Sequence, residues 1–191
     1  MQAHGVALFP ADTVYGLACT PDAPEAVDRL YRLKGRRPDK PAAVMFFDRE
    51  RALAALPELG ERTRAALVAL LPGALTVLLP NPAARFPLAC GPDPATLGLR
   101  VPSLAGDLAP LADVRRPVLQ SSANLAGGPD ARRIEDVPDD IRRDVDLVLD
   151  AGELPGTPST VIDLRSFEAR GEWSIVREGA VAATDLAGRL D

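Results

Sequence analysis

Short apolar runs alternate along the chain with stretches in which apolar residues recur at helical spacing. Several runs are apolar throughout, which is typical of strands that are covered on both faces in an α/β protein. The predicted strands cover residues 6–9, 42–47, 75–79, 97–101, 118–120, 145–149, 161–164 and 174–176. Residues 10–16 and 80–96 are rich in proline and in small or polar residues, and they are predicted to form a turn and a loop.

Helices are predicted between these strands. Asp22 followed by Glu25 resembles a capping box, and Gly35 suits the position just past the end of that first helix. Asp48 is predicted to cap a second helix. Further helices are predicted over residues 62–71, 104–111 and 134–141. The elements together predict one α/β domain over residues 1–191, with helices around a twisted, open, mixed sheet.

Composition narrows the class of protein. The 191 residues are 47% hydrophobic and 26% charged, as in an ordinary soluble globular protein. No apolar run approaches the roughly 18 residues of a membrane-spanning helix. The first residues show no secretory signal, so we expect a cytoplasmic protein without a membrane partner. The net charge of −5 gives no chain-wide basic field for nucleic acid, so any anion site must come from a local cluster of cations.

The chain has few residues for metal or nucleophilic chemistry. Cys19 and Cys90 are far apart and His4 is the single histidine, so neither a zinc site nor a Ser-His-Asp triad is expected. The G-x-x-x-x-G-K-[ST] and G-x-G-x-x-G fingerprints are also absent. Any nucleotide site must therefore be of another kind.

Two cations flank a glycine at the end of the first predicted helix. Lys34 and Arg36 could both reach one polyphosphate, the lysine as a point charge and the arginine as a bidentate fork. Alternatively, they are there only because cations are favoured at a helix C-terminus, by about 0.3–1 kcal/mol. Lys34 continues the apolar stripe of Val27, Leu30 and Tyr31. An inward-facing lysine needs a partner or a ligand, which favours the functional interpretation.

Other polar residues stand out against apolar strands. Ser122 and Asn124 follow a buried strand, where they could build an anion nest or simply an Asx turn. Arg100 lies within an apolar run and needs either a carboxylate ligand or a structural aspartate. Ser159 precedes one predicted strand and Arg177 follows another; by themselves they resemble minor capping features.

Seven short motifs, in this order, resemble those of the YrdC-like L-threonylcarbamoyladenylate synthase family. The resemblance spans nearly the whole chain, and the ordered set is specific although each motif alone is weak. The motifs are PADTVYGL at residues 10–17, LKGR at 33–36, PGALT at 72–76, LRVP at 99–102, SAN at 122–124, STVID at 159–163 and VREG at 176–179.

The resemblance implies a fold and a reaction. It implies the short form of the family, a YrdC-like domain alone, with a concave, positively charged cavity. L-threonine, bicarbonate and ATP would give threonylcarbamoyl-AMP and pyrophosphate, with Mg²⁺ held through the phosphates. A downstream enzyme would transfer the threonylcarbamoyl group to the adenosine beside the anticodon of certain tRNAs. Contact between this chain and tRNA would be indirect or weak.

The same resemblance implies roles for single residues. The residues implied for the nucleotide site are Lys34, Arg36, Ser122, Asn124 and Arg177. The residues implied for the other substrates are Thr13, Lys40, Arg100 and Ser159. No side chain is an evident nucleophile. Catalysis would then rest on positioning carboxylated threonine in line with the α-phosphorus of ATP.

The chain also departs from the family pattern. Ala11 replaces a threonine linked to the amino-acid site, Lys40 stands where asparagine is commoner, and Ala126 and Glu178 replace a serine and a proline. Two alternatives therefore stay open: a paralogue that adenylates another carbamate or carbamoyl donor, and a non-catalytic module that binds RNA, double-stranded RNA included. In the leading interpretation, replacing Lys34 by Ala should abolish turnover with little loss of stability, because an unpaired buried cation is removed.

Overall fold

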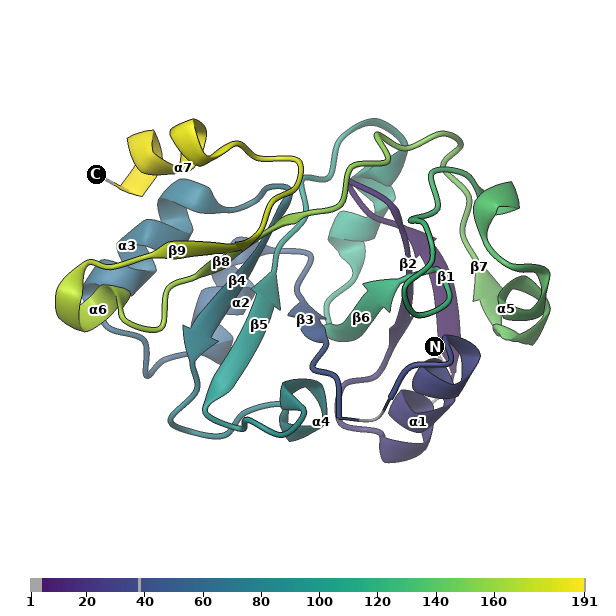
Figure 1. Ribbon diagram of the computed structural model, residues 1–191, viewed down its shortest axis with the longest axis horizontal. Helices are drawn as coiled ribbons and strands as arrows, with labels where there is room; N and C mark the ends of the chain where they lie inside the picture. The colour runs from purple at the N-terminus through teal and green to yellow at the C-terminus, as the bar shows by residue number, and fades with distance from the viewer. Residues whose placement is uncertain (1–4, 38, 191) are drawn as a thin grey trace.

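The strands of the protein form one open, mixed sheet (Figure 1). The computed structural model describes residues 5–37 and 39–190. Within these ranges the strands are β1 (Val6–Pro10), β2 (Tyr15–Cys19), β3 (Ala43–Met45), β4 (Leu75–Pro80), β5 (Thr96–Arg100), β6 (Val118–Ser122), β7 (Leu147–Val148), β8 (Thr160–Asp163) and β9 (Ser174–Arg177). They pair in the order β7-β1-β2-β6-β3-β5-β4-β8-β9. Three of these pairs, β1–β7, β3–β5 and β4–β8, are parallel and the others are antiparallel, as the prediction of a mixed sheet required.

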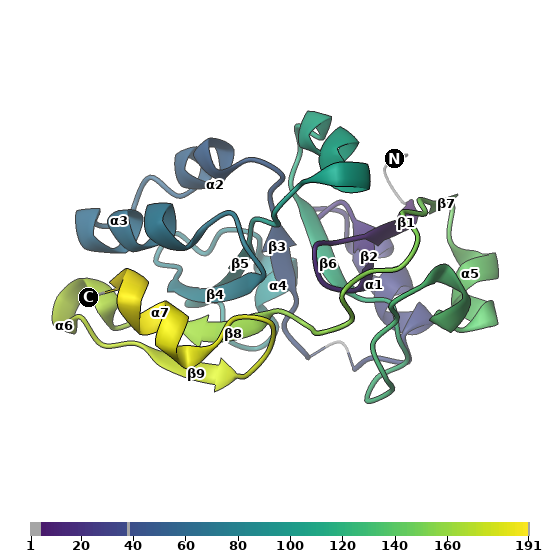
Figure 2. The same cartoon turned by 90° about the horizontal axis from the view of Figure 1, so that it is seen from above.

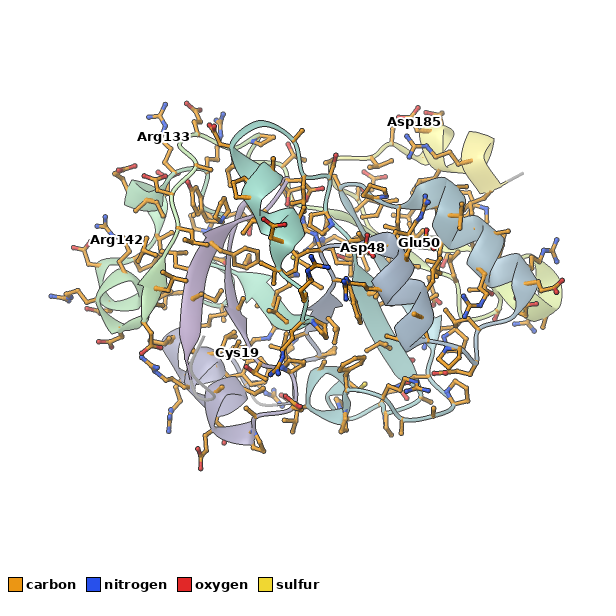
Figure 3. The ribbon with its side chains drawn as sticks, turned by 180° about the vertical axis from the view of Figure 1, so that it is seen from behind. Cys19, Asp48, Glu50, Arg133, Arg142 and Asp185 are labelled. Carbon is orange, nitrogen blue, oxygen red and sulfur yellow. The ribbon has the colours of Figure 1, made fainter. Side chains whose placement is uncertain are left out.

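Helices surround this sheet. They are α1 (Pro24–Leu33), α2 (Arg49–Ala55), α3 (Glu61–Leu70), α4 (Pro87–Cys90), α5 (Asp139–Asp144), α6 (Phe167–Arg170) and α7 (Ala183–Leu190), with the 3-10 segments η1 (Gly106–Asp113) and η2 (Ile134–Asp136). Figures 1 and 2 show α5 and α6 at opposite ends of the long axis. From behind, α2, α3 and η1 lie nearest the viewer (Figure 3).

The hairpin of β1 and β2 is buried throughout, and it corrects one prediction. Residues 10–16 were expected to be a turn, but the loop is confined to residues 11–14 and β2 begins at Tyr15. Gly16, which suggested the turn, is instead needed for close packing. A Cβ atom there would lie 3.1 Å from the Phe9 ring and 3.2 Å from the carbonyl oxygen of Ser121.

The first helix begins later than its sequence suggested. The N-cap of α1 is Ala23, which makes no side-chain cap, and Pro24 occupies the first turn. The capping box of Asp22 and Glu25 is therefore wrong. Proline suits this position because its missing N–H would be unpaired there anyway. The end is as predicted: Gly35 follows the C-cap with a positive φ of 57°.

The other predicted helices lie near their predicted positions, but some of them are 3-10 segments instead of α-helices. Asp48 caps α2 by accepting the backbone N–H of Arg51, and α3 ends just before a cis Leu71–Pro72 bond. The helix predicted over residues 104–111 is the 3-10 segment η1, Gly106–Asp113, which contains Pro110. Residues 134–141 divide into η2 and α5, and the loop over 80–96 includes α4. The short helices α6 and α7 were not predicted.

Apolar side chains are buried on both faces of the sheet. The larger cluster joins the strands to α1, α3 and α7. A smaller cluster lies on the opposite face and consists of Phe9, Ala11, Ala18, Met45, Phe47 and Val118, against which Leu104, Leu111 and Val114 pack. The continuous apolar runs in the sequence are explained by this double coverage.

The sequence also led to predictions about the cysteines, the histidine and membrane-spanning helices. Cys19 and Cys90 are buried free thiols, and burial raises the pKa of Cys19 to about 12, so this thiol is inert at neutral pH. Cys19 lies beside α1 in Figure 3. His4 lies outside the described residues. Within residues 5–37 and 39–190, no helix combines the length and the apolarity needed to cross a bilayer.

Candidate functional site

One face of the sheet carries a row of polar side chains that come from strands far apart in sequence. Successive residues of a strand point to opposite faces, so residues paired across strands, or two apart in one strand, share a face. The register therefore places the following residues on the same face: Gln120 and Ser122 of β6, Ala43 of β3, Arg100 of β5, Thr76 of β4, Val161 of β8 and Arg177 of β9.

These side chains line a cavity of about 170 Å³. The loops beside the strands complete its wall with Val14, Tyr15, Arg36, Pro41, Ala42, Ser121, Asp130, Pro158 and Ser159. Among the described lining residues, Arg36, Arg100 and Arg177 are cationic and Asp130 is the one carboxylate. The wall is thus suited to an anionic ligand, in a protein whose net charge is −5.

Arg36 is half-buried and held in place by its neighbours. Its Nη2 donates to the carbonyl oxygen of Pro41 at 2.5 Å, and its Nη1 donates to Ser121 Oγ at 3.3 Å. The guanidinium carbon lies 5.8 Å from the centre of the Tyr31 ring. Its buried Nε has no partner in the described part of the chain. The remaining donors can therefore bind a ligand oxygen without rearrangement of the side chain.

Arg100 has the aspartate partner that one interpretation required. Its Nη2 donates to Asp12 Oδ1 and to Thr13 Oγ1, each at 2.6 Å. The Arg100 and Asp12 side chains are 4% and 7% exposed. The Arg100 Nε has no partner among the described residues, and the side chain also lines the cavity, so a role in ligand binding is compatible with the ion pair. Thr13 is fully buried and does not itself line the cavity.

Lys34 is buried, but it is not unpaired. Its Nζ donates to the carbonyl oxygens of Ser122 and Asn124 and to Asn124 Oδ1, the last two at 2.8 and 3.1 Å. An ammonium group has three donors, and all three are used on this loop. Burial, assisted by the charge of Arg36, lowers the pKa of Lys34 to about 8, and Asp130 opposes the shift. The premise that Lys34 is an unpaired cation is therefore wrong, and we now expect its removal to cost stability.

The loop after β6 is fixed by its own side chains. Ser122 Oγ donates to Asn124 Oδ1 at 2.5 Å, and Asn124 Nδ2 donates to the carbonyl oxygen of Gly128 at 2.6 Å. This is not the Asx turn of the alternative interpretation, because the N–H of Ala126, two residues on, donates to the Lys34 carbonyl oxygen instead of to Asn124 Oδ1. Ser122 lines the cavity, whereas Lys34 and Asn124 stand behind its wall.

The last two strands bring a second group of residues to the cavity. Ser159 Oγ lies 2.9 Å from Thr76 Oγ1, and Arg177 Nη2 donates to the carbonyl oxygen of Ser159 at 2.6 Å. Gly179 allows the chain to pass close by, because a Cβ atom there would lie 2.3 Å from the Pro158 carbonyl oxygen. The ordered PGALT and VREG motifs are thus neighbours in space.

Not every residue singled out in the sequence reaches the cavity. Ala11, which replaces a family threonine, is buried in the smaller apolar cluster. Lys40 is exposed, and its carbonyl oxygen accepts the Tyr31 hydroxyl at 3.0 Å. Thr76 and Gln120 line the cavity but were not predicted to. The signal for Thr76 was its place in a motif, and that for Gln120 was an amide in an otherwise apolar strand.

Comparisons with known proteins show the family to which the chain belongs. The family model Sua5_yciO_yrdC, described as "Telomere recombination", matches residues 1–179. A threonylcarbamoyl-AMP synthase of Pyrococcus abyssi is 31% identical over 160 residues, which cover 83% of this chain and 47% of that protein. A relative of the same name from Stenotrophomonas maltophilia is 34% identical over 165 residues, which cover 82% of this chain and 84% of that protein.

The fold is also found among solved structures. The crystal structure of P. abyssi Sua5 complexed with L-threonine superposes with a TM-score of 0.81 and 27% sequence identity, covering 97% of this chain and 54% of that one. The chain spans about half the length of the P. abyssi relative and of a Bacillus subtilis relative, 47% in each case.

Proposed function

The chain belongs to the Sua5_yciO_yrdC family, and on that premise we propose that it is an L-threonylcarbamoyladenylate synthase. One observation carries this proposal. Arg36, Arg100 and Arg177 come from three separate parts of the sequence and line the same cavity, together with Ser122 and Ser159. Such a wall suits a ligand with several negative charges, such as ATP beside a carboxylate. The relatives' shared name supports the choice of reaction.

The proposed reaction requires positioning more than nucleophilic side chains. Threonine and bicarbonate give N-carboxythreonine with loss of water. A carbamate oxygen then forms a bond to the α-phosphorus of ATP as the bond to the leaving pyrophosphate breaks. The protein holds the two reactants in line and stabilises charge on the phosphates. No catalytic nucleophile is needed.

Each cavity residue takes a role that its contacts allow. Arg36 and Ser122 bind the nucleotide, and Arg177, hydrogen-bonded to Ser159, binds the polyphosphate from the opposite wall. The Nε of Arg100 is available for the threonine carboxylate. We assign Lys34 and Asn124 to positioning, because their bonds shape the loop that presents Ser122.

The proposal also includes a metal ion and a downstream partner enzyme. Among the described residues, no group of three or more His, Cys, Asp or Glu side chains could hold a metal ion. We propose a Mg²⁺ ion that is coordinated mainly by phosphate oxygens, where it would neutralise charge on the leaving pyrophosphate. A downstream enzyme would take the threonylcarbamoyl group to tRNA. The net charge of −5 supports weak or indirect contact between tRNA and this chain.

The experiment is a pyrophosphate-release assay with ATP, Mg²⁺, bicarbonate and L-threonine, with each omitted in turn. We expect release that depends on threonine and bicarbonate. Replacing Arg36 by Met should raise the KM for ATP by about 10- to 150-fold, because bonds to a charged group are lost. The matched control is R37M: Arg37 is exposed, its one ionic partner among the described residues is Asp39 on the surface, and the change should alter KM by less than about twofold. Absence of threonine-dependent release in the wild type would refute the proposal.

A further inference from the structure

Asp130 supplies a carboxylate to a cavity wall that is otherwise suited to anions. No hydrogen bond or ion pair joins this carboxylate to another residue in the described part of the chain. By contrast, Asp12 is paired with Arg100. The carboxylate of Asp150 likewise accepts the hydroxyl of Tyr15 at 2.7 Å. Asp130 is thus free, as far as the described residues go, to bind a ligand in the cavity.

The backbone holds Asp130 at the wall that is formed by the loop after β6. Ala131, the next residue, is 1% exposed, and its carbonyl oxygen accepts the backbone N–H of Tyr15 at 2.9 Å. Asp130 itself is half-buried. Burial and the charge of Arg36 lower the pKa of Lys34, and the charge of Asp130 opposes this shift. Since both charges act on the same ammonium group, Asp130 lies on the same side of the cavity as Arg36.

The two sides of the cavity differ in their net charge. On the side reached from β6, the negative charge of Asp130 compensates the positive charge of Arg36. On the side formed by β9, Arg177 donates to the carbonyl and hydroxyl oxygens of Ser159, which are neutral, so its charge is not compensated. β6 and β9 are separated in the sheet by β3, β5, β4 and β8. The polyphosphate is therefore favoured near Arg177, and the uncharged nucleoside near Asp130.

The chemistry of a carboxylate narrows the group that Asp130 can bind. An ionised carboxylate only accepts hydrogen bonds, so it repels phosphate oxygens and requires donors. A ribose has two adjacent hydroxyl donors, which match the two oxygens of one carboxylate, and an acidic side chain binds a ribose hydroxyl in dinucleotide-binding sites. The ammonium group of threonine fits less well, because an ion pair would keep protonated the nitrogen that must become a carbamate.

We propose that Asp130 binds the ribose of ATP by accepting hydrogen bonds from its 2′- and 3′-hydroxyl groups, and that it thereby selects ribonucleotides over deoxyribonucleotides. This inference rests on the proposed function, and it names the part of the nucleotide that this side of the cavity recognises. A site built to bond a hydroxyl rejects the analogue that lacks it. The wild type should therefore bind ATP at least about tenfold more tightly than 2′-dATP or 3′-dATP, because each analogue loses a hydrogen bond to a charged group.

The test is calorimetry of ATP, 2′-dATP and 3′-dATP binding to the wild type, to D130A and to the control variant D107A. Asp107 is exposed on η1 and does not line the cavity, so D107A should bind all three nucleotides as the wild type does. D130A should bind ATP about tenfold more weakly and should prefer ATP over the deoxynucleotides by less than about twofold. Its melting temperature should match that of the wild type, because no hydrogen bond or ion pair between described residues is lost.

Repeating the titrations without Mg²⁺ separates binding of ribose from binding of the metal ion. The loss of affinity in D130A should persist, since hydroxyl groups require no metal. A loss that is equal for ATP and the deoxynucleotides, or that disappears without Mg²⁺, would overturn the inference by placing Asp130 on the base or on the metal. The titrations contain no threonine, so failure of the pyrophosphate assay refutes the proposed function without deciding the role of Asp130. Equal affinity of the wild type for all three nucleotides, or binding of none of them, refutes that role.

Discussion

Replacing Lys34 by Met should destabilise the protein, because it removes the group that ties α1 to the loop after β6. Methionine keeps most of the side-chain volume, so the change is chiefly the loss of three bonds, to the Ser122 and Asn124 carbonyl oxygens and to Asn124 Oδ1. Removing one partner of a buried charged interaction costs about 3–5 kcal/mol. The buried charge is itself unfavourable, as the pKa of about 8 indicates, so removal returns part of this loss.

The expected net loss is about 3 kcal/mol, the lower end of that range, or roughly 6–12 °C in melting temperature for a chain of this size. Urea denaturation followed by circular dichroism measures the free energy of unfolding. The chain offers a matched control, since Lys40 is its other lysine and is exposed, so K40M should differ from the wild type by less than about 0.5 kcal/mol. A K34M variant as stable as K40M would show that the ammonium does not hold the loop.

Three further predictions follow from the contacts. The pKa of Lys34 falls from 10.5 to about 8 on folding, so the unfolded chain binds more protons than the folded chain between these pH values. The wild type should therefore gain stability relative to K34M as the pH rises from about 8 to about 10.5. Urea denaturation at about pH 7 and about pH 10 measures this gain. D12A should cost about 3–5 kcal/mol in the same assay, because Arg100 loses its ionic partner; a smaller loss would mean that water replaces the carboxylate. G179A should displace Arg177 from Ser159, since its Cβ would overlap the Pro158 carbonyl, and should raise the KM for ATP; an unchanged KM would place Arg177 outside the nucleotide site.

Much of the fold was predictable because its apolar runs are continuous. Strands buried on both faces, such as β1 and β3, are marked by their composition alone. The errors occur where packing overrides local preference. Gly16 suggested a turn but is required by the close approach of Phe9 and Ser121. Asp22 and Glu25 have capping chemistry, but Pro24 fixed the start of the helix one residue beyond Ala23.

The residues of the site were predictable from the sequence, but the hydrogen bonds that join them were not. The motifs identified Arg36, Arg100 and Arg177, which the register brings to one cavity. The sequence could not show that the three N–H donors of Lys34 all bind the loop after β6. These bonds depend on the position in space of residues about ninety positions further along the chain. Nor could the sequence identify Gln120, because the face on which one amide falls depends on strand pairing.

The place of β8 and β9 at one end of the sheet has a consequence for synthesis of the protein. β8 pairs with β4, which is made long before it, and β9 pairs with β8 alone among the described strands. A nascent chain that has left the ribosome as far as residue 154 therefore holds most of the sheet but exposes the open edge of β4. Ser159 and Arg177 arrive with the strands that cover this edge, so a partly synthesised chain lacks the wall that we propose to bind the polyphosphate. Competence to bind nucleotide should therefore report that synthesis has passed Arg177.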